Sequence, residues 1–368
     1  MEENFLKKKN VEKEDENKKR GLLFILGKRI RNGRLLFLIV AFLLTLVGLS
    51  ASTYAWFTSN FTVSVQQIDV NVSSGSGIQI STNAVDWKSL VTLNDITTNM
   101  YSTAVNQVPT STSQMNPVST VKTAFPEATT KSQGLKMFRG TITNSVVDGK
   151  MYLNSTQLTD GASGNNDYVA FDLFVKLDFG SAKQVYLTPG TGIIAGNPNT
   201  HIEYAGRMAF VIQGNAPSST AAAGLQDLKG ATNILFYEPN YDVHTANGIQ
   251  NANNNYPYAV NGVTLTETGN AAPTVYYGVK SAFTYDPATE STGVILGSTD
   301  TNKFDQVTPD ITTAAGNTTR TAFLTLQPGV TKMRVYMWVE GQDVDCENNA
   351  SGGQVIFNLG FTVDEANS

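Results

Sequence analysis

The residues of this chain that could do chemistry are few and widely spaced. The chain has 368 residues but only two histidines, His201 and His244, and one cysteine, Cys346. Two histidines cannot build a three-histidine metal centre, and neither belongs to an HExxH motif, which supplies zinc ligands from one helix. One cysteine excludes an intramolecular disulfide and a multi-cysteine zinc site. An enzyme is therefore disfavoured, since GxSxG and Walker-type phosphate loops are also missing from the sequence.

One short acidic stretch has the spacing of a cation site. Asp343, Asp345 and Glu347 place three carboxylates at alternate positions, and hard cations such as calcium prefer oxygen ligands. The stretch lacks the glycine and the final acidic residue of an EF-hand loop, and Gln354 stands in the final place. A solvated acidic hairpin loop is the favoured interpretation, and calcium binding is the alternative. Cys346 is either a small buried residue or an exposed thiol that pairs with another chain.

The charge distribution separates the N-terminus from the rest of the chain. Residues 1–34 hold eleven Lys or Arg against six Asp or Glu, whereas the remainder holds 15 against 25. A nucleic-acid-binding surface needs clustered positive charge, so nucleic acid is not an expected partner of the acidic body. From residue 56 onward, 41 Thr, 23 Ser and 29 Asn outnumber the 40 charged residues. That composition is typical of β-rich, turn-rich surface proteins.

The first 55 residues have the order of a secretory signal. The basic residues 1–34 precede the apolar run LLFLIVAFLLTLV and the small and polar GLSASTYA, which together fill residues 35–55. Small side chains at Thr53 and Ala55 suit cleavage by a signal peptidase before Trp56. The alternative is an uncleaved membrane anchor with a cytoplasmic N-terminus, because about 20 apolar residues can span a bilayer. Either way the body, residues 56–368, is expected to be extracellular or on the cell surface.

The body reads as a series of short strands. Residues 168–179 alternate between two faces, one of them apolar throughout, which predicts a half-buried strand. Similar patterns predict further strands at 183–187, 202–212, 233–237, 275–279, 293–296, 321–326, 333–339 and 355–363. One helix is expected at 219–228, where a Ser/Thr cap precedes AAAGLQDL. These features predict an all-β fold, specifically an antiparallel sandwich of jelly-roll type.

Two stretches interrupt the strand pattern. Residues 97–133 and 240–273 are dense in Thr, Ser, Asn and Pro, and we expect long surface loops there. The alternative is a binding rim in which tyrosines such as Tyr241 contact a surface glycan or a protein ligand. Trp338 lies on the polar-facing side of its predicted strand, where a neighbouring loop covers it or leaves it exposed for contact.

The segment after the proposed cleavage site carries the most specific hypothesis. Its apolar residues change parity across Gln66 and Gln67, which predicts a β-bulge or two short strands that meet at a bend. Those apolar residues are Phe61, Val63, Val65, Ile68, Val70 and Val72. The strand can complete its own sheet, or it can pair with the sheet of a neighbouring copy, because an incomplete sheet exposes unpaired backbone groups. A place within its own sandwich is favoured for the isolated molecule.

The same border carries a family resemblance. STYAWFTSN followed by FTVSVQQIDV resembles the signal and mature start of exported proteins of the TasA and camelysin type. The resemblance implies cleavage by a specialised, SipW-dependent type of signal peptidase in a Gram-positive bacterium. It also implies a non-enzymatic jelly-roll subunit of the cell surface or biofilm matrix that self-assembles into fibres by N-terminal strand exchange. The alternative function is a membrane-tethered adhesin or glycan-binding module, and no cofactor besides calcium is expected.

Overall fold

A computed structural model shows how the body folds. It describes residues 64–73, 77–109, 115–125, 134–144, 151–162, 165–178, 180–231, 233–246, 248–249, 276–284, 294–295, 303–346 and 354–363. All of them belong to one compact unit, Thr53–Ser368. The predicted all-β class is confirmed, because strands dominate this part of the chain and its helices are short.

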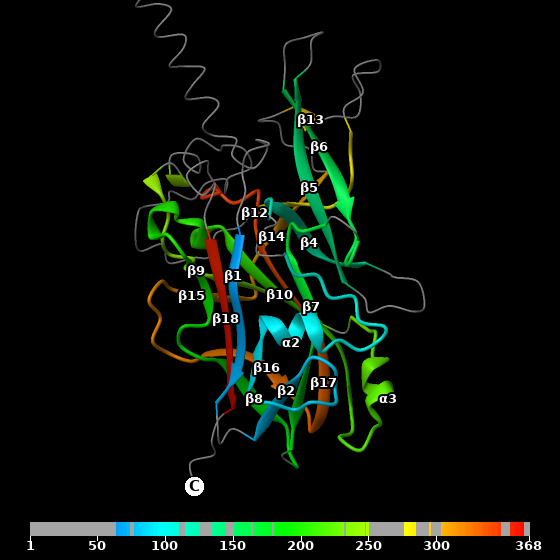
Figure 1. Cartoon of the computed structure of the whole chain (residues 1–368). Coiled ribbons are helices and arrows are strands. Elements are labelled where there is room, and N and C mark those ends of the chain that lie inside the picture. Colours follow the sequence, from blue (N-terminus) through cyan, green and yellow to red (C-terminus); the bar gives the residue numbers. More distant parts are fainter. Residues whose placement is uncertain are drawn as a thin grey trace, which may run out of the picture. The chain divides into compact units, whose positions relative to one another are not determined.

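The first sheet brings the two ends of the described chain together. Its order is β16-β8-β18-β1-β3, and β9 also pairs with β18. β1 and β18 run side by side, blue and red in Figure 1, and they are parallel. The strands are β1 (Ser64–Val72), β3 (Leu90–Thr92), β8 (Lys183–Leu187), β9 (Gly192–Ala195), β16 (Thr321–Leu326) and β18 (Gln354–Val363).

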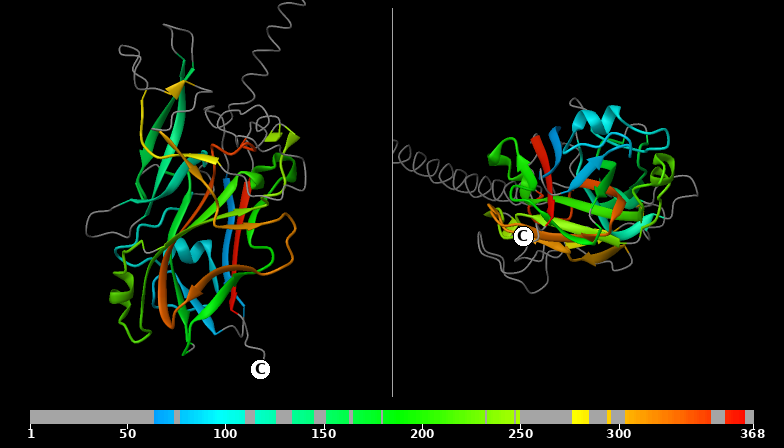
Figure 2. Two further views of the ribbon diagram at one scale, coloured as in Figure 1. Left: turned by 180° about the vertical axis from the view of Figure 1, so that it is seen from behind. Right: turned by 90° about the horizontal axis from the view of Figure 1, so that it is seen from below.

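The second sheet faces the first, as the two further views in Figure 2 show. Its order is β15-β11-β10-β17-β7-β2, and all eleven residues of β17 at its centre are buried. The strands are β2 (Ile78–Ser81), β7 (Val169–Leu177), β10 (Gly206–Ala216), β11 (Asn233–Pro239), β15 (Ile311–Thr313) and β17 (Gly329–Val339).

Smaller elements complete the described fold. A four-stranded sheet has the order β13-β6-β5-β4, and β12 pairs with β14. These strands are β4 (Val118–Phe125), β5 (Gly134–Asn144), β6 (Met151–Leu158), β12 (Tyr276–Val279), β13 (Val294–Ile295) and β14 (Phe304–Val307). The helical segments are α2 (Leu93–Thr98), α3 (Ala222–Gln226), η2 (Pro198–Thr200) and η3 (Ile202–Tyr204).

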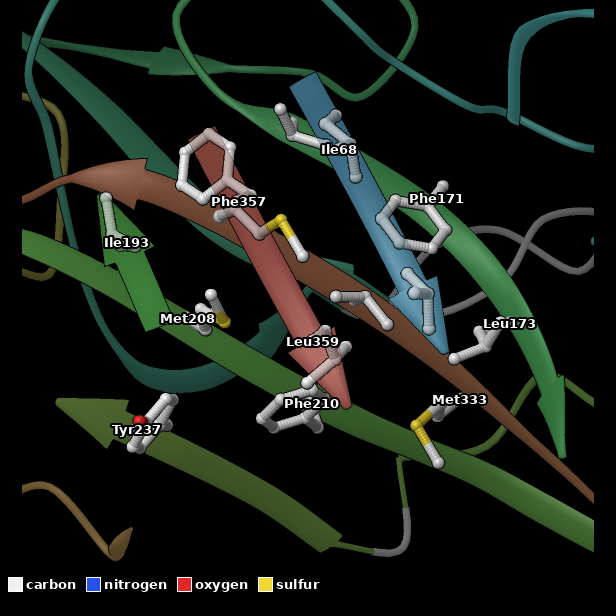
Figure 3. Packing of buried hydrophobic residues seen from close by; sticks show 14 of the residues in the cluster. Ile68, Phe171, Leu173, Ile193, Met208, Phe210, Tyr237, Met333, Phe357 and Leu359 are labelled. Atoms are coloured by element: carbon white, nitrogen blue, oxygen red, sulfur yellow. The ribbon is translucent and has the colours of Figure 1, made fainter. Parts of the chain in front are cut away.

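The largest apolar core lies between the first two sheets. Ile68 of β1 and Leu359 of β18 point toward Phe171 and Phe210 of the second sheet, as Figure 3 shows. The alternating residues of β18 follow the same pattern, with Val355, Phe357, Leu359, Phe361 and Val363 buried. Because successive side chains of a strand point to opposite faces, the period-two sequence pattern directly selects this buried face.

A second apolar core covers the other face of the second sheet. It joins Tyr336 and Trp338 of that sheet, and Tyr168 just before β7, with Val118 of β4. The prediction of a half-buried strand at 168–179 is therefore wrong, since β7 is covered on both faces. Trp338 is fully buried and meets Phe236 edge to face, with ring centroids 5.6 Å apart. Of the two alternatives for Trp338, the covered side chain is confirmed.

Several other expectations about local structure are confirmed. The strands predicted at 183–187 and 321–326 coincide with β8 and β16. The predicted helix contains α3. The strand predicted at 202–212 starts later, at Gly206, because residues 202–204 form the 3-10 turn η3.

Two expectations about pairing and loops are wrong. The sheets are mixed, because β1 pairs with β18 in parallel and β11 pairs with β15 in parallel. Residues 97–133 are not one long loop, since they contain the end of α2 and all of β4. The helix α2 begins with a capping box between Thr92 and Asp95. The sequence of β4 resembles that of a loop, because polar residues such as Ser119 and Thr120 are buried in it beside apolar ones.

Candidate functional site

The candidate site is the first strand and the place it occupies. In β1 the predicted parity shift is confirmed as a β-bulge, because the register with β18 shifts between Val65 and Gln67. Val65 and Ile68 are an odd number of positions apart, so in a regular strand they would point to opposite faces. The bulge places both on the same buried face. The apolar residues Val65, Ile68, Val70 and Val72 are all buried, with at most 5% exposure.

The pairing of β1 differs on its two sides. Along β18 the partners run from Ser64 with Gln354 to Val72 with Phe361. On the other side, β3 pairs only with residues 69–71 of β1. Burial of the four apolar side chains contributes about 6 to 12 kcal/mol, at about 1.5 to 3 kcal/mol each. β1 is therefore a well-packed strand that the first sheet holds mainly through β18.

A glycine- and serine-rich connection follows β1. The sequence from Ser73 to Gly77 reads SSGSG, and β2 then enters the second sheet beside β7. Gly77 has φ = 64°, a left-handed conformation that glycine adopts without steric cost. β1 is thus attached to the other sheet through a connection whose composition permits large changes of direction.

Some of the predicted site residues lie outside the described residues. These are the cleavage residues Thr53, Ala55 and Trp56, the strand residues Phe61 and Val63, and the acidic residue Glu347. The same holds for the apolar run within residues 35–55. Among the helices that the structure describes, none has the length and apolar character needed to cross a membrane.

The two described residues of the acidic stretch, Asp343 and Asp345, are buried, so the interpretation as a solvated hairpin loop is wrong for them. Asp343 is 7% exposed and Asp345 is 2% exposed. Asp343 accepts a hydrogen bond from Arg207, and Asp345 lies 2.7 Å from Nδ1 of His244. Within the described residues, no group of acidic, histidine or cysteine side chains has a geometry that could hold a metal ion. Cys346 is buried as well, which was one of its two alternatives.

The residues around this stretch form a buried cluster that the sequence analysis missed. Arg207 of β10 donates to Glu238 of β11 at 2.6 Å, and both residues are 1% exposed. Glu340 is fully buried and accepts from the indole of Trp338 at 3.0 Å. The signal in the sequence was a single arginine in the apolar run RMAFVI and a glutamate after NILFY. Such isolated charges in buried strands require partners of opposite charge.

A second buried network connects β17 with β7. Arg334 lies 2.9 Å from Asp172, and Lys332 lies 3.4 Å from the other oxygen of the same carboxylate. Lys332 also donates to the backbone oxygens of Gln226 at 2.8 Å and Leu228 at 3.0 Å. Arg334 and Lys332 lower the pKa of Asp172 although burial opposes this. These contacts hold Lys332 and Asp172 as an ion pair inside the fold.

The surface has two cavities of note. One of about 170 Å³ is lined by hydroxyl, amide and glycine residues such as Thr191, Thr313 and Asn240. The other, of about 460 Å³, lies between the edge strand β16 and the strands β10 and β11, with Phe323 and Leu235 in its wall. Tyr241 lies in the described chain next to Asn240, whereas most of the stretch 240–273 lies outside the described residues.

Comparison with known proteins gives no relative for this chain. No family model, no curated protein and no solved structure matches it.

Proposed function

We propose that this chain is an exported, non-enzymatic structural protein of the cell surface or biofilm matrix, built on a jelly-roll-type sandwich. In this proposal it belongs with the TasA and camelysin type of proteins, and its copies assemble by exchange of the N-terminal strand. The observation that carries the proposal is the place of β1, a buried terminal strand held parallel to β18 and joined to the body by SSGSG.

Exchange of β1 requires no new type of contact. If β1 of one copy leaves its place, the unpaired edge of β18 and the apolar sites of Ile68 and Val70 are open to the β1 of another copy. The exchanged strand makes the same contacts as before, so the free energy of each contact is unchanged. The equilibrium between β1 in its own sheet and β1 in the sheet of another copy then depends on the connection at residues 73–77 and on the concentration of the protein.

The N-terminal leader gives this strand its position beside a processing site. We propose export through the signal in residues 35–55 and cleavage between Ala55 and Trp56, which leaves only a short segment before β1. N-terminal sequencing of the extracellular form tests this. A start at Trp56 supports the processed subunit, and an intact N-terminus instead supports the membrane-tethered adhesin.

A pair of introduced cysteines tests the exchange directly. Asp69 of β1 and Asn358 of β18 are register partners, so the variant D69C/N358C, made with Cys346→Ser, places two thiols side by side. In the monomer, oxidation gives a disulfide within one chain. In filaments built by exchange, oxidation links each copy to the next, and a covalent ladder appears on a non-reducing gel.

The control pair joins strands that do not exchange. Asn215 of β10 and Thr331 of β17 are also register partners, and N215C/T331C should give only intrachain disulfides in monomers and filaments alike. Filaments of D69C/N358C with intrachain disulfides only would show that β1 stays in its own sheet. Failure of the processed chain to form filaments, or filaments that persist after deletion of residues 56–72, would contradict the assembly proposal as a whole.

A further inference from the structure

The buried cluster around Arg207 joins several parts of the fold that are distant in the sequence. Arg207 contacts Glu238 and Asp343, and Asp343 also accepts from the backbone N–H of Asp345 at 2.8 Å. The cluster thereby connects β10 and β11 with the connection between β17 and β18. His244 extends it to the segment that follows β11, because its imidazole bonds to Asp345.

Residues 243–246, called here the His244 segment, make several contacts with one carboxylate, that of Asp345. The carboxylate of Asp345 lies 2.7 Å from Nδ1 of His244. It also accepts hydrogen bonds from the backbone N–H of Thr245 at 2.9 Å and from the hydroxyl of Thr245 at 3.3 Å. Gly248 packs so closely that a Cβ there would lie 2.1 Å from Oδ1 of Asp345. Asp345 is therefore a point at which this segment is attached to the body.

The cluster contains more acids than bases. Four carboxylates, those of Glu238, Glu340, Asp343 and Asp345, surround one arginine, and all are at most 7% exposed. The groups that face His244 and its partners are Asp345, Asp343, Glu238, Arg207, Glu340, Tyr204 and Tyr276. Oε2 of Glu238 has no hydrogen-bond partner among the described residues, which makes a charge on that oxygen costly. A proton on His244 supplies the second positive charge of the cluster.

We propose that the His244 segment is a pH-dependent latch, docked on Asp345 while His244 is protonated and released from the β17–β18 connection when His244 loses its proton. The latch is independent of strand exchange and applies to the single chain. The geometric basis of the latch is the buried contact between His244 and Asp345. Among the described ion pairs, His244 is the one basic side chain that contacts Asp345.

The protonation equilibria of the cluster support this direction. Burial disfavours a charged imidazole, but the hydrogen bond and charge of Asp345, with Asp343 and Glu238, raise the pKa of His244 overall. Burial raises the pKa of Glu238 to about 8. A histidine with a raised pKa stabilises the docked state fully below its ordinary pKa, and this stabilisation is lost as the pH rises through the folded value. The latch is thus closed in mildly acidic solution and opens in alkaline solution.

Cys346 offers a built-in reporter of the latch. It is the only cysteine, it is buried, and it follows Asp345 directly. In the full chain, we expect the protection of this thiol from a maleimide or disulfide reagent to fall between pH 6 and pH 9, by about tenfold for each unit by which docking raises the pKa of His244. Rates are divided by those of the denatured chain at each pH, because thiolate formation itself accelerates labelling.

Two histidine variants make the test specific. His244→Gln should reduce the change of protection with pH and leave only the part that Glu238 and Glu340 contribute, whereas the matched control His201→Gln should keep the full change. Equal protection of the wild-type thiol at pH 6 and pH 9, or an unchanged pH response in H244Q, would overturn the latch.

A second measurement covers the case in which H244Q does not fold. In H201Q the only imidazole signal in an NMR titration is that of His244. Its midpoint should coincide with the midpoint of Cys346 protection, and midpoints more than about one pH unit apart would overturn the assignment, because one unit is a tenfold difference in protonation equilibrium.

Discussion

Arg334 and Asp172 are direct register partners across β17 and β7, and their side chains form an ion pair with Nη1 and Oδ1 2.9 Å apart. Both side chains are 1% exposed, and Arg334 also bonds to Asp160 at 2.8 Å. The pair lies on the face of the second sheet that looks away from the largest core. Charged residues on the apparently polar face of two neighbouring strands can therefore pair with each other inside the protein, and that face need not be exposed to water.

Removal of one member of this pair should cost much stability. Arg334→Met leaves Asp172 with one cationic neighbour, Lys332, among the described ion pairs, and we expect a loss of about 3 to 5 kcal/mol in the free energy of unfolding. Urea denaturation of the chain measures the loss. The control is Lys280→Met, because Lys280 and Asp305 form a partly exposed pair whose loss should cost about 1 kcal/mol or less. Equal losses of unfolding free energy in the two variants would contradict the expectation that a buried ion pair is more costly to break than a partly exposed one.

Stability should also depend on pH in two opposite windows. Burial raises the pKa of Glu340 to about 7 and that of Glu238 to about 8, so their contribution to stability is lost as the pH rises from the ordinary carboxyl range toward those values. The pKa of Asp172 is lowered by Arg334 and Lys332 against the effect of burial, so its contribution is lost as the pH falls below 3.8. We expect a higher melting temperature at pH 5 than at pH 8 or pH 3.

Neutral substitutions in the cluster test the alkaline window. Glu340→Gln and Glu238→Gln cannot ionise, so each should reduce the loss of melting temperature between pH 5 and pH 8. A wild-type curve that rises from pH 5 to pH 8 would refute the raised pKa of both carboxyl groups. Unchanged slopes in both variants would place the titrating groups elsewhere.

Close backbone packing between β12 and β4 gives a third prediction. A Cβ at Gly278 would lie 2.1 Å from the backbone oxygen of Thr120, so Gly278→Ala forces the two strands apart. We expect a loss of about 2 to 4 kcal/mol, in the range of overpacked core positions. Gly180→Ala is the matched control, because no atom of the described residues, its chain neighbours aside, lies within 4 Å of a Cβ added there, and it should change stability by about 0.5 kcal/mol or less. Thermal unfolding that ranks the two variants in the reverse order would contradict this packing.

The fourth prediction concerns calcium. Asp343 is engaged with Arg207 and Asp345 with His244 and Thr245, so a calcium ion would have to displace these partners. We expect millimolar calcium to leave the melting temperature unchanged at pH 7. A rise that EDTA reverses, and that Asp343→Asn removes, would restore the calcium interpretation.

The hydrophobic pattern predicted the strands well, and it predicted the bulge in β1 from six apolar residues alone. Parity is a local property, and the buried face of Val65 and Ile68 follows from it wherever the strand is placed. Strand direction is not local. The parallel pairing of β1 with β18 depends on where the chain returns, and the sequence pattern carries no signal for this.

The two buried charged clusters beside the candidate site could not be predicted from the sequence, because each charged residue is buried against a partner of opposite charge. Asp172, Arg334 and Asp343 each look like solvent-facing residues when read alone. Their burial depends on partners that lie in other strands and on β4 and β12, which cover the second sheet. A single sequence gives no register between such distant strands, so the pairs cannot be recognised before the fold is known.

The neighbourhood of β1 and β18 also constrains how this molecule can form. Val65 of β1 and Val355 of β18 are register partners although almost three hundred positions separate them. The first sheet therefore cannot be completed until β18 has been synthesised and has reached β1. Contacts of such long range form slowly, because a large loop must be ordered before they contribute any stability. For most of its synthesis the chain has only the short strand β3 to pair with β1, and the longer pairing edge of β1 stays open until β18 has been made.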